Sequence, residues 1–220
     1  DDTEEFLYPE NVIKIYMTFS ECQKLIKSKF DFDAQIPNPK KLCDYKVAYG
    51  EMFQEYIKDY DFWGHCDADL IFGDIRKFVT DDILNKYDRL GVDGFFSLFR
   101  NTIEINAIYR KADDITKIFT EQKPFGFDEW GLCHNGTAHY WMNNLKDKVW
   151  LDKVFDNLAP YHYGFFSGTV RKFNLGIKKI MFSFENGKLF RYGIKDGQVV
   201  KDESLYVHIQ KRTVYVETLV

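Results

Sequence analysis

The chain has 220 residues, a mass of 26.1 kDa and a formal net charge of −4 at pH 7. Hydrophobic residues make up 45% of it, which excludes wholesale disorder and suits one domain over residues 1–220 with its own core. The acidic balance excludes a general nucleic-acid binder, because phosphate contacts need a basic face. No run of about 18 apolar residues is present that would span a membrane.

Strand and helix patterns alternate in the first half of the chain. Thr18 and Glu21 form a capping box, which predicts that a helix begins there, and Asn101 and Glu104 repeat the spacing. Apolar runs predict strands, and apolar residues three or four apart predict helices. We expect strands over residues 12–17, 61–66 and 94–99, and helices over residues 18–29, 42–57 and 80–87.

Strand and turn signals dominate the second half. Residues 178–184 and 188–192 flank Asn186-Gly187, and Asn-Gly between two such segments is a strong hairpin signal. Asp196-Gly197 predicts a second turn, and residues 205–209 predict a late strand. We therefore expect an α/β fold in which helices flank a mixed sheet, with a β-rich C-terminal part.

Four cysteines are widely spaced in apolar segments, and none forms a Cys-x-x-Cys pair: Cys22, Cys43, Cys66 and Cys133. This spacing favours reduced, buried thiols over a disulfide framework or a zinc site. No signal-peptide pattern opens the sequence. Both observations lead us to expect a cytoplasmic protein.

An Asp-x-Asp sequence directly follows the predicted strand over residues 61–66. In an extended backbone the side chains of Asp67 and Asp69 share one face, so both carboxylates can converge on one ion. A hard divalent cation takes one or two carboxylates together with the oxygens of a diphosphate. The pattern predicts a metal site, with a pair of solvated loop aspartates as the structural alternative.

The run from Lys41 through Phe78 resembles a bacterial family of uncharacterised GT-A-type glycosyltransferases often found near polysaccharide biosynthesis genes. Further stretches match at residues 98–102, 127–131 and 207–212. The resemblance implies a GT-A-like fold with Mn²⁺ or Mg²⁺ as cofactor. It also implies a nucleotide-sugar donor, expected to be a UDP-sugar, and a saccharide or lipid-linked saccharide acceptor. The expected location is the cytoplasm, including the inner face of the membrane by peripheral association.

GT-A folds open with a β-α-β unit that holds the nucleotide base. Residues 1–3 resemble the loop that follows this unit, so we expect the unit to be absent from this sequence. Much of the base-binding pocket is therefore not assigned to residues here.

The resemblance also suggests which residues bind metal and donor. Several GT-A families take a third metal ligand from a late histidine, which implies His208 beside Asp67 and Asp69, and imidazole suits Mn²⁺. Basic groups near the diphosphate would neutralise the charge that grows there in the transition state. The expected donor-binding residues are Lys46, Asp67, Arg100, Asn101, Lys211 and Arg212.

An acidic pair in an aromatic segment is the candidate catalytic group. Asp128 and Glu129 lie between Phe127 and Trp130, and an inverting glycosyltransferase needs a carboxylate that accepts the proton of the acceptor hydroxyl. The sequence does not decide which of the two is the base, and both also suit the start of a helix. Trp130 is expected to contact the acceptor, because aromatic rings suit sugar faces.

Two other functions fit part of the pattern. A haloacid-dehalogenase-type phosphatase also places Asp-x-Asp after an apolar strand, but the late acidic pair of that class is not evident. A non-catalytic carbohydrate-binding protein would use the many aromatic residues as stacking platforms, yet would not need converging carboxylates and a late histidine.

Overall fold

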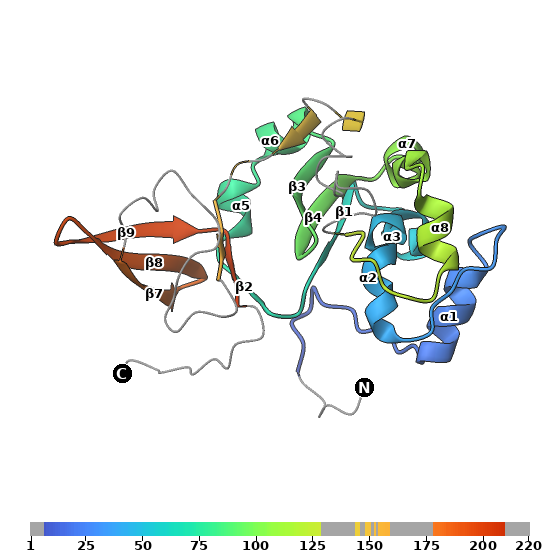
Figure 1. The fold of residues 1–220 in the computed structure, drawn as a ribbon. Coiled ribbons are helices and arrows are strands. Elements are labelled where there is room, and N and C mark those ends of the chain that lie inside the picture. The colour runs from blue at the N-terminus through green and yellow to red at the C-terminus, as the bar shows by residue number, and fades with distance from the viewer. Residues whose placement is uncertain are drawn as a thin grey trace.

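The structure is a computed structural model, and it describes residues 7–128, 144–145, 148–150, 152, 154–158 and 178–209. Over these residues it is a mixed α/β protein with three small sheets. Most helices, among them α1 (Phe19–Lys27) and α8 (Ile115–Thr120), gather on one side of the sheet that contains β1 (Phe62–Cys66). The helices α5 (Ile75–Phe78) and α6 (Asp81–Lys86) lie on its other side, toward the sheet formed by residues 178–204 (Figure 1). In the described part of the chain, no helix is both long and apolar enough to cross a bilayer.

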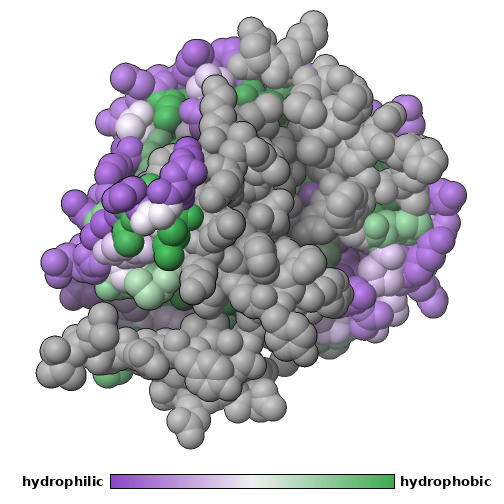
Figure 2. Space-filling view, turned by 60° about the vertical axis from the view of Figure 1, so that its left-hand side comes forward, coloured by the Kyte–Doolittle hydropathy of each residue, from purple (hydrophilic) through white to green (hydrophobic). Residues whose placement is uncertain are grey.

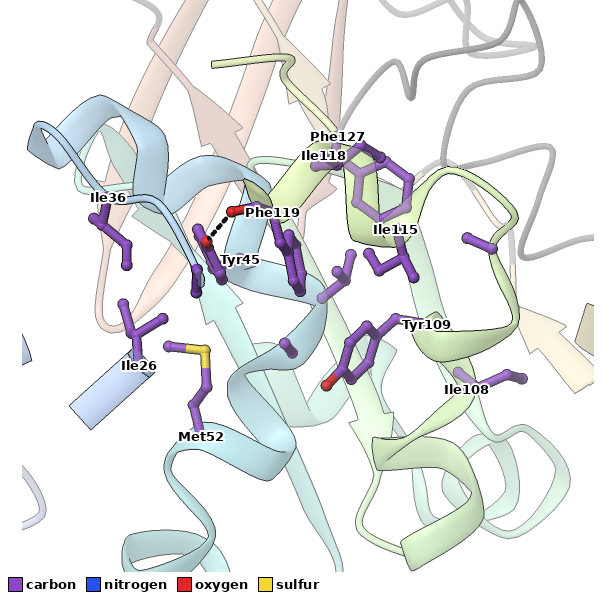
Figure 3. Close-up of a cluster of buried hydrophobic side chains, with 14 of the residues drawn as sticks. Ile26, Ile36, Tyr45, Met52, Ile108, Tyr109, Ile115, Ile118, Phe119 and Phe127 are labelled. Atoms are coloured by element: carbon purple, nitrogen blue, oxygen red, sulfur yellow. Dashed lines mark hydrogen bonds between the residues drawn. The ribbon is translucent and has the colours of Figure 1, made fainter. Parts of the chain in front are cut away.

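The helical part is built from short elements around an aromatic and aliphatic core. Tyr45 stacks on Phe119 with ring centroids 4.2 Å apart, and its hydroxyl donates to the Phe119 carbonyl at 3.0 Å (Figure 3). The elements are α1 (Phe19–Lys27), η1 (Pro39–Lys41), α2 (Leu42–Tyr45), η2 (Lys46–Ala48), α3 (Tyr49–Met52), α4 (Gln54–Ile57), α7 (Ile103–Asn106), η3 (Ile108–Lys111) and α8 (Ile115–Thr120). This core fixes the helices that carry Lys46.

The first sheet has the strand order β1-β4-β3-β5. Its strands are β1 (Phe62–Cys66), β4 (Phe96–Arg100), β3 (Arg89–Asp93) and β5 (Val149–Trp150). β1 and β3 run antiparallel to β4, whereas β5 runs parallel to β3. Trp63 of β1 stacks on Phe99 of β4, with 4.5 Å between ring centroids, and this fixes β1 to the sheet.

The second sheet continues from the first through the Asp-x-Asp sequence. It has the order β2-β10-β6, with β2 (Leu70–Phe72), β10 (Tyr206–His208) and β6 (Asp156–Asn157). β10 is antiparallel to β2 and parallel to β6. Tyr206 packs against Phe96 of the first sheet at 5.2 Å and against Phe72 of its own sheet at 5.6 Å between ring centroids. The two sheets therefore share an aromatic core at the end of β1.

The third sheet consists of two consecutive hairpins, β7 (Lys178–Glu185), β8 (Lys188–Lys195) and β9 (Gln198–Ser204). Both turns have positive φ at their two central residues, with Gly187 and Gly197 at +77°. Such turns match the strand twist and favour Asn-Gly and Asp-Gly.

On the face turned forward in Figure 2, hydrophobic residues of the described chain form patches bordered by hydrophilic ones. Exposed apolar side chains of this sheet include Met181 and Val199.

Several predicted elements are confirmed. α1 begins with the predicted capping box of Thr18 and Glu21, and Thr80 caps α6 (Asp81–Lys86) through its hydroxyl. β1 and β4 match two of the predicted strands within two residues, and both turns of the β7–β9 sheet are present. Asp74 caps the remaining short helix, α5 (Ile75–Phe78).

Four predictions about elements were wrong. Residues 12–17 form no strand with another described segment, and Ile13 is 79% exposed. The helix expected over residues 42–57 is a series of short helical turns, interrupted at Phe53, which has φ −110° and ψ 24°. We expected Asp67 and Asp69 to follow a central buried strand, but among the described residues β1 is an edge strand, and Gly64 and Cys66 in it are exposed. Thr102 caps α7, not Asn101.

Candidate functional site

The Asp-x-Asp sequence links two sheets. Asp67 follows the last residue of β1, and its backbone N–H donates to the Phe95 carbonyl at 2.9 Å. Asp69 precedes β2, and its carbonyl accepts from the Ile209 N–H at 2.9 Å. Both ends of the sequence are thereby tied to neighbouring backbone, which limits where the two carboxylates can lie.

His208 comes to the same place through strand pairing. It is the last residue of β10 and lies opposite Leu70, the first residue of β2, so pairing of these strands sets the imidazole beside Asp69. Its Nε2 is 3.2 Å from Asp69 Oδ1, and its ring stacks on Phe95 with centroids 4.5 Å apart. The pairing brings His208 to the Asp-x-Asp sequence, although the two lie far apart in the chain, and this proximity was predicted.

Asp67, Asp69 and His208 together offer three ligand atoms within 4.8 Å of one another. Ligands on opposite sides of a Mg²⁺ ion lie about 4 Å apart and those of Ca²⁺ about 5 Å apart, so this set is the right size for one ion. Two carboxylates and an imidazole suit Mg²⁺ through their oxygens and Mn²⁺ through both ligand types. The chemistry of the residues present therefore fits the predicted cofactor.

Lys46, on η2, lies between two carboxylates. Its Nζ is 2.6 Å from Asp67 Oδ1 and 2.8 Å from Asp128 Oδ2, and it donates to the Gly94 carbonyl at 2.8 Å. Burial alone would lower the pKa of the ammonium, but attraction by Asp128 and hydrogen bonds to both carboxylates outweigh this and raise the pKa. Lys46 therefore stays charged and neutralises part of the acidic charge around Asp67.

A second buried pair holds the segment that carries Asp128. Lys41 and Asp44 are fully buried and form an ion pair at 2.9 Å. The Asp44 carboxylate accepts from the backbone N–H groups of Phe125 and Phe127, the latter at 2.9 Å. Lys41 donates to the Ile118 and Lys123 carbonyls. These bonds place Asp128 beside Lys46.

Lys41 and Asp44 were not among the site residues predicted from the sequence. Their spacing, with Lys46 two residues after Asp44, was the available signal, because charged residues that recur in an apolar segment need partners. The sequence could not show that those partners lie near residues 118–127.

Asp128 lies next to Lys46 and is only 6% exposed. The other predicted residues of the catalytic and acceptor groups, Glu129 and Trp130, lie outside the described residues, as do Lys211 and Arg212. The structure therefore brings together five predicted site residues: Lys46, Asp67, Asp69, Asp128 and His208.

Arg100 and Asn101 were expected at the same edge of the sheet as Asp67 and Asp69, and this expectation was wrong. β4 runs antiparallel to β1, so Arg100 pairs with Phe62 at the end of β1 that is remote from Asp67. Arg100 binds Asp88 at 2.7 Å, and the Asn101 amide donates to the Ile57 and Tyr60 carbonyls. Both residues stabilise the far end of the sheet.

Two titratable groups of β1 stay neutral near the candidate site. Burial, followed by the positive charges of Lys46 and Arg89, lowers the pKa of His65 to about 3. Cys66 is exposed, so the prediction of a buried thiol was wrong there, and partial desolvation and the nearby Asp67 raise the pKa of its thiol. At neutral pH neither group adds charge to the carboxylates, so Lys46 is the cation in contact with Asp67 among these residues.

Comparisons with known proteins identify a family but no function. No curated protein and no solved structure matches the chain. One family model matches residues 1–219, which is nearly the whole sequence. The chain belongs to this family, which is described as a family of unknown function, DUF6625.

Proposed function

We propose that the protein is a metal-dependent glycosyltransferase with a GT-A-like fold. The donor is a nucleotide-diphosphate sugar, with a UDP-sugar expected, and the acceptor is a saccharide or a lipid-linked saccharide. The observation that carries the proposal is the convergence of Asp67, Asp69 and His208 at the end of β1. The resemblance of residues 41–78 to GT-A-type enzymes supplies the reaction class.

The metal-binding residues in this proposal are Asp67, Asp69 and His208. A bound Mn²⁺ or Mg²⁺ would supply positive charge for the donor diphosphate. Lys46 lies beside Asp67, so its ammonium adds positive charge next to the proposed metal-binding residues. Lys211 and Arg212, which follow β10 in the sequence, are proposed to neutralise the leaving diphosphate.

The proposed catalytic carboxylate belongs to the pair Asp128 and Glu129. The Asp128 carboxylate is occupied by the Lys46 ammonium, which makes it a poor proton acceptor unless Lys46 moves away. This favours Glu129 as the base and Asp128 as a residue that positions Lys46. Trp130 is proposed to stack on the acceptor sugar.

Separate substitution of the two carboxylates distinguishes these roles. We expect Glu129→Gln to lower sugar transfer by about 10²-fold or more while donor binding persists, which is the usual scale for loss of a general base. Wild-type transfer rates in both Glu129→Gln and Asp128→Asn would place the base elsewhere or point to a retaining reaction.

Thermal unfolding with a panel of nucleotide sugars tests the proposal. A ligand that binds only the folded state raises Tm by mass action. We expect UDP-sugars to raise Tm more with Mn²⁺ than with EDTA, and Asp69→Asn to lose the difference. Asp59→Asn, which removes a charge from an exposed position, is the matched control and should behave as wild type. No shift with any nucleotide at any Mn²⁺ concentration would contradict the proposal.

Localisation and partners follow from the same proposal. We propose a cytoplasmic enzyme that reaches lipid-linked acceptors by peripheral association with the membrane, and no nucleic acid as a partner. Cell fractionation tests this: the protein is expected in the cytosol and in the salt-extractable membrane fraction.

A further inference from the structure

Lys46 occupies all the hydrogen-bonding capacity of its ammonium within the protein. An ammonium has three N–H donors, and here they meet Asp67, Asp128 and the Gly94 carbonyl at 2.6, 2.8 and 2.8 Å. Lys46 is 8% exposed and Asp128 is 6% exposed, so water screens their charges poorly. The position of the ammonium is thus set by the fold.

The ammonium shares Asp67 with the candidate metal position. Lys46 contacts Oδ1 of Asp67, whose carboxylate also faces Asp69 and His208. Two cations on one carboxylate repel each other strongly at such short range. Asp128 reduces this repulsion, because its carboxylate lies 2.8 Å from the Lys46 ammonium and neutralises part of that charge.

The net charge of the residues joined by these contacts is equal and opposite to the charge of one divalent ion. Asp67, Asp69 and Asp128 carry three negative charges and Lys46 carries one positive charge, which leaves two negative charges. Without Asp128 only one negative charge would remain. Without both Lys46 and Asp128, two negative charges would again remain, those of Asp67 and Asp69.

We propose that Lys46 and Asp128 form a buried counter-charge pair that sets the divalent-metal affinity of the Asp67-Asp69-His208 site. Asp128 is a positioning residue, since it acts on Asp67 through Lys46. This inference rests on the proposed function, because it assumes that the three residues bind a metal ion. It adds a determinant of affinity that lies outside the set of metal ligands.

Mn²⁺ binding without nucleotide, followed by electron paramagnetic resonance at one fixed pH, tests the pair. Loss of a side chain that orients a metal ligand commonly weakens binding 10–100-fold, and we expect Asp128→Asn to weaken Mn²⁺ binding by about this factor. The double variant Lys46→Met with Asp128→Asn restores the charge balance, so its affinity should return to within about threefold of wild type. A purely structural role for Asp128 would predict no such rescue.

Asp88→Asn is the matched control, because Asp88 forms an ion pair with Arg100 at the far end of the first sheet and should leave Mn²⁺ affinity unchanged. Wild-type affinity in Asp128→Asn, or a double variant that binds no better than Asp128→Asn, would overturn the inference. If Asp128→Asn does not fold, the double variant alone tests the inference. Mn²⁺ binding by the double variant that is about tenfold weaker than in the wild type would then overturn the inference. Absence of Mn²⁺ binding by the wild type would instead overturn the proposed metal site itself.

Discussion

Each charged residue of the segment Lys41–Lys46 has a partner in the protein interior. Lys41 pairs with Asp44, and Lys46 pairs with Asp67 and Asp128. Buried charges are tolerated only when they are paired and hydrogen-bonded, so these pairs tie the short helices to the segments beside them. These buried ion pairs fix the positions of Lys46 and Asp128 beside Asp67.

Removal of the Asp44 charge tests the buried pair. Asp44→Asn leaves the Lys41 ammonium in the core without a counter-ion and weakens the bonds to Phe125 and Phe127. We expect the free energy of unfolding to fall by about 3–5 kcal/mol in urea denaturation. Asp33→Asn is the control, since its partner Lys27 and Asp33 itself are exposed and such pairs contribute about 0–1 kcal/mol. Equal effects of the two changes would contradict this account.

His65 predicts a pH dependence of stability. Its folded-state pKa of about 3 lies below the unfolded value of about 6.5, so the unfolded chain binds the proton more strongly. The stabilisation by neutral His65 is present above pH 6.5 and is lost as the pH falls toward 3. Between pH 7 and 5 this amounts to about 2 kcal/mol.

His65→Leu should remove that part of the dependence. The ring lies near Tyr49 and Phe99, and its buried Nδ1 has no hydrogen-bond partner, so an apolar side chain suits the position. Chemical denaturation of the metal-free protein at pH 7, 6 and 5 measures the difference between variant and wild type. Parallel pH profiles for the two proteins would show that His65 does not titrate as described.

At the scale of elements, close approach between β2 and the third sheet depends on Gly73. A Cβ at this position would lie 2.7 Å from the Ser204 carbonyl oxygen and 2.8 Å from the Leu189 backbone nitrogen. Backbone atoms cannot move aside as side chains do, so the segment after β2 would have to shift. Because β2 pairs with β10, such a shift would also disturb His208.

We expect Gly73→Ala to lower the free energy of unfolding by about 1–3 kcal/mol, the usual cost of overpacking, as measured by urea denaturation. Glu55→Ala is the control, because Glu55 is exposed in α4 and such surface substitutions usually change stability by less than about 0.5 kcal/mol. If Gly73→Ala is as stable as the control, the contact between β2 and the third sheet is looser than described.

Elements that are determined by residues close together in the sequence could be predicted from it. The capping box of α1 and the two hairpin turns depend on residues within four positions of each other, and all are present. The helix expected over residues 42–57 is interrupted at Phe53, and the contact of Lys46 with Asp128, far along the chain, could not be predicted from local signals. Residues 12–17 have the composition of a strand, yet no described strand pairs with them.

At the scale of the whole molecule, the candidate site is assembled by contacts between sheets. Asp67 and Asp69 could be grouped from their spacing alone, whereas His208 required a resemblance, because only the pairing of β10 with β2 brings it to Asp69. Arg100 was assigned to the wrong end of the sheet because the sequence does not show that β4 runs antiparallel to β1. Direction and partner of a strand are properties of the assembled fold.

The third sheet is joined to the second by a buried polar network. Arg191 of β8 binds Asp156 of β6 at 2.9 Å and Asp202 of β9 at 2.9 Å, and Ser204 donates to Asp156 at 3.2 Å. β6 lies beside β10, so this network supports the strand that ends in His208. The candidate ligands are therefore held by two sheets and by the buried charges of the helical part.

The central claim is that Asp67, Asp69 and His208 bind one divalent ion. Anomalous diffraction from crystals soaked in Mn²⁺ tests it most directly, because the signal locates the metal independently of any reaction. We predict one strong peak about 2.0–2.6 Å from a carboxylate oxygen of Asp67, one of Asp69 and a ring nitrogen of His208, and no peak there in His208→Ala with Asp69→Asn. A fully soaked crystal with no anomalous peak at these three residues would contradict the claim.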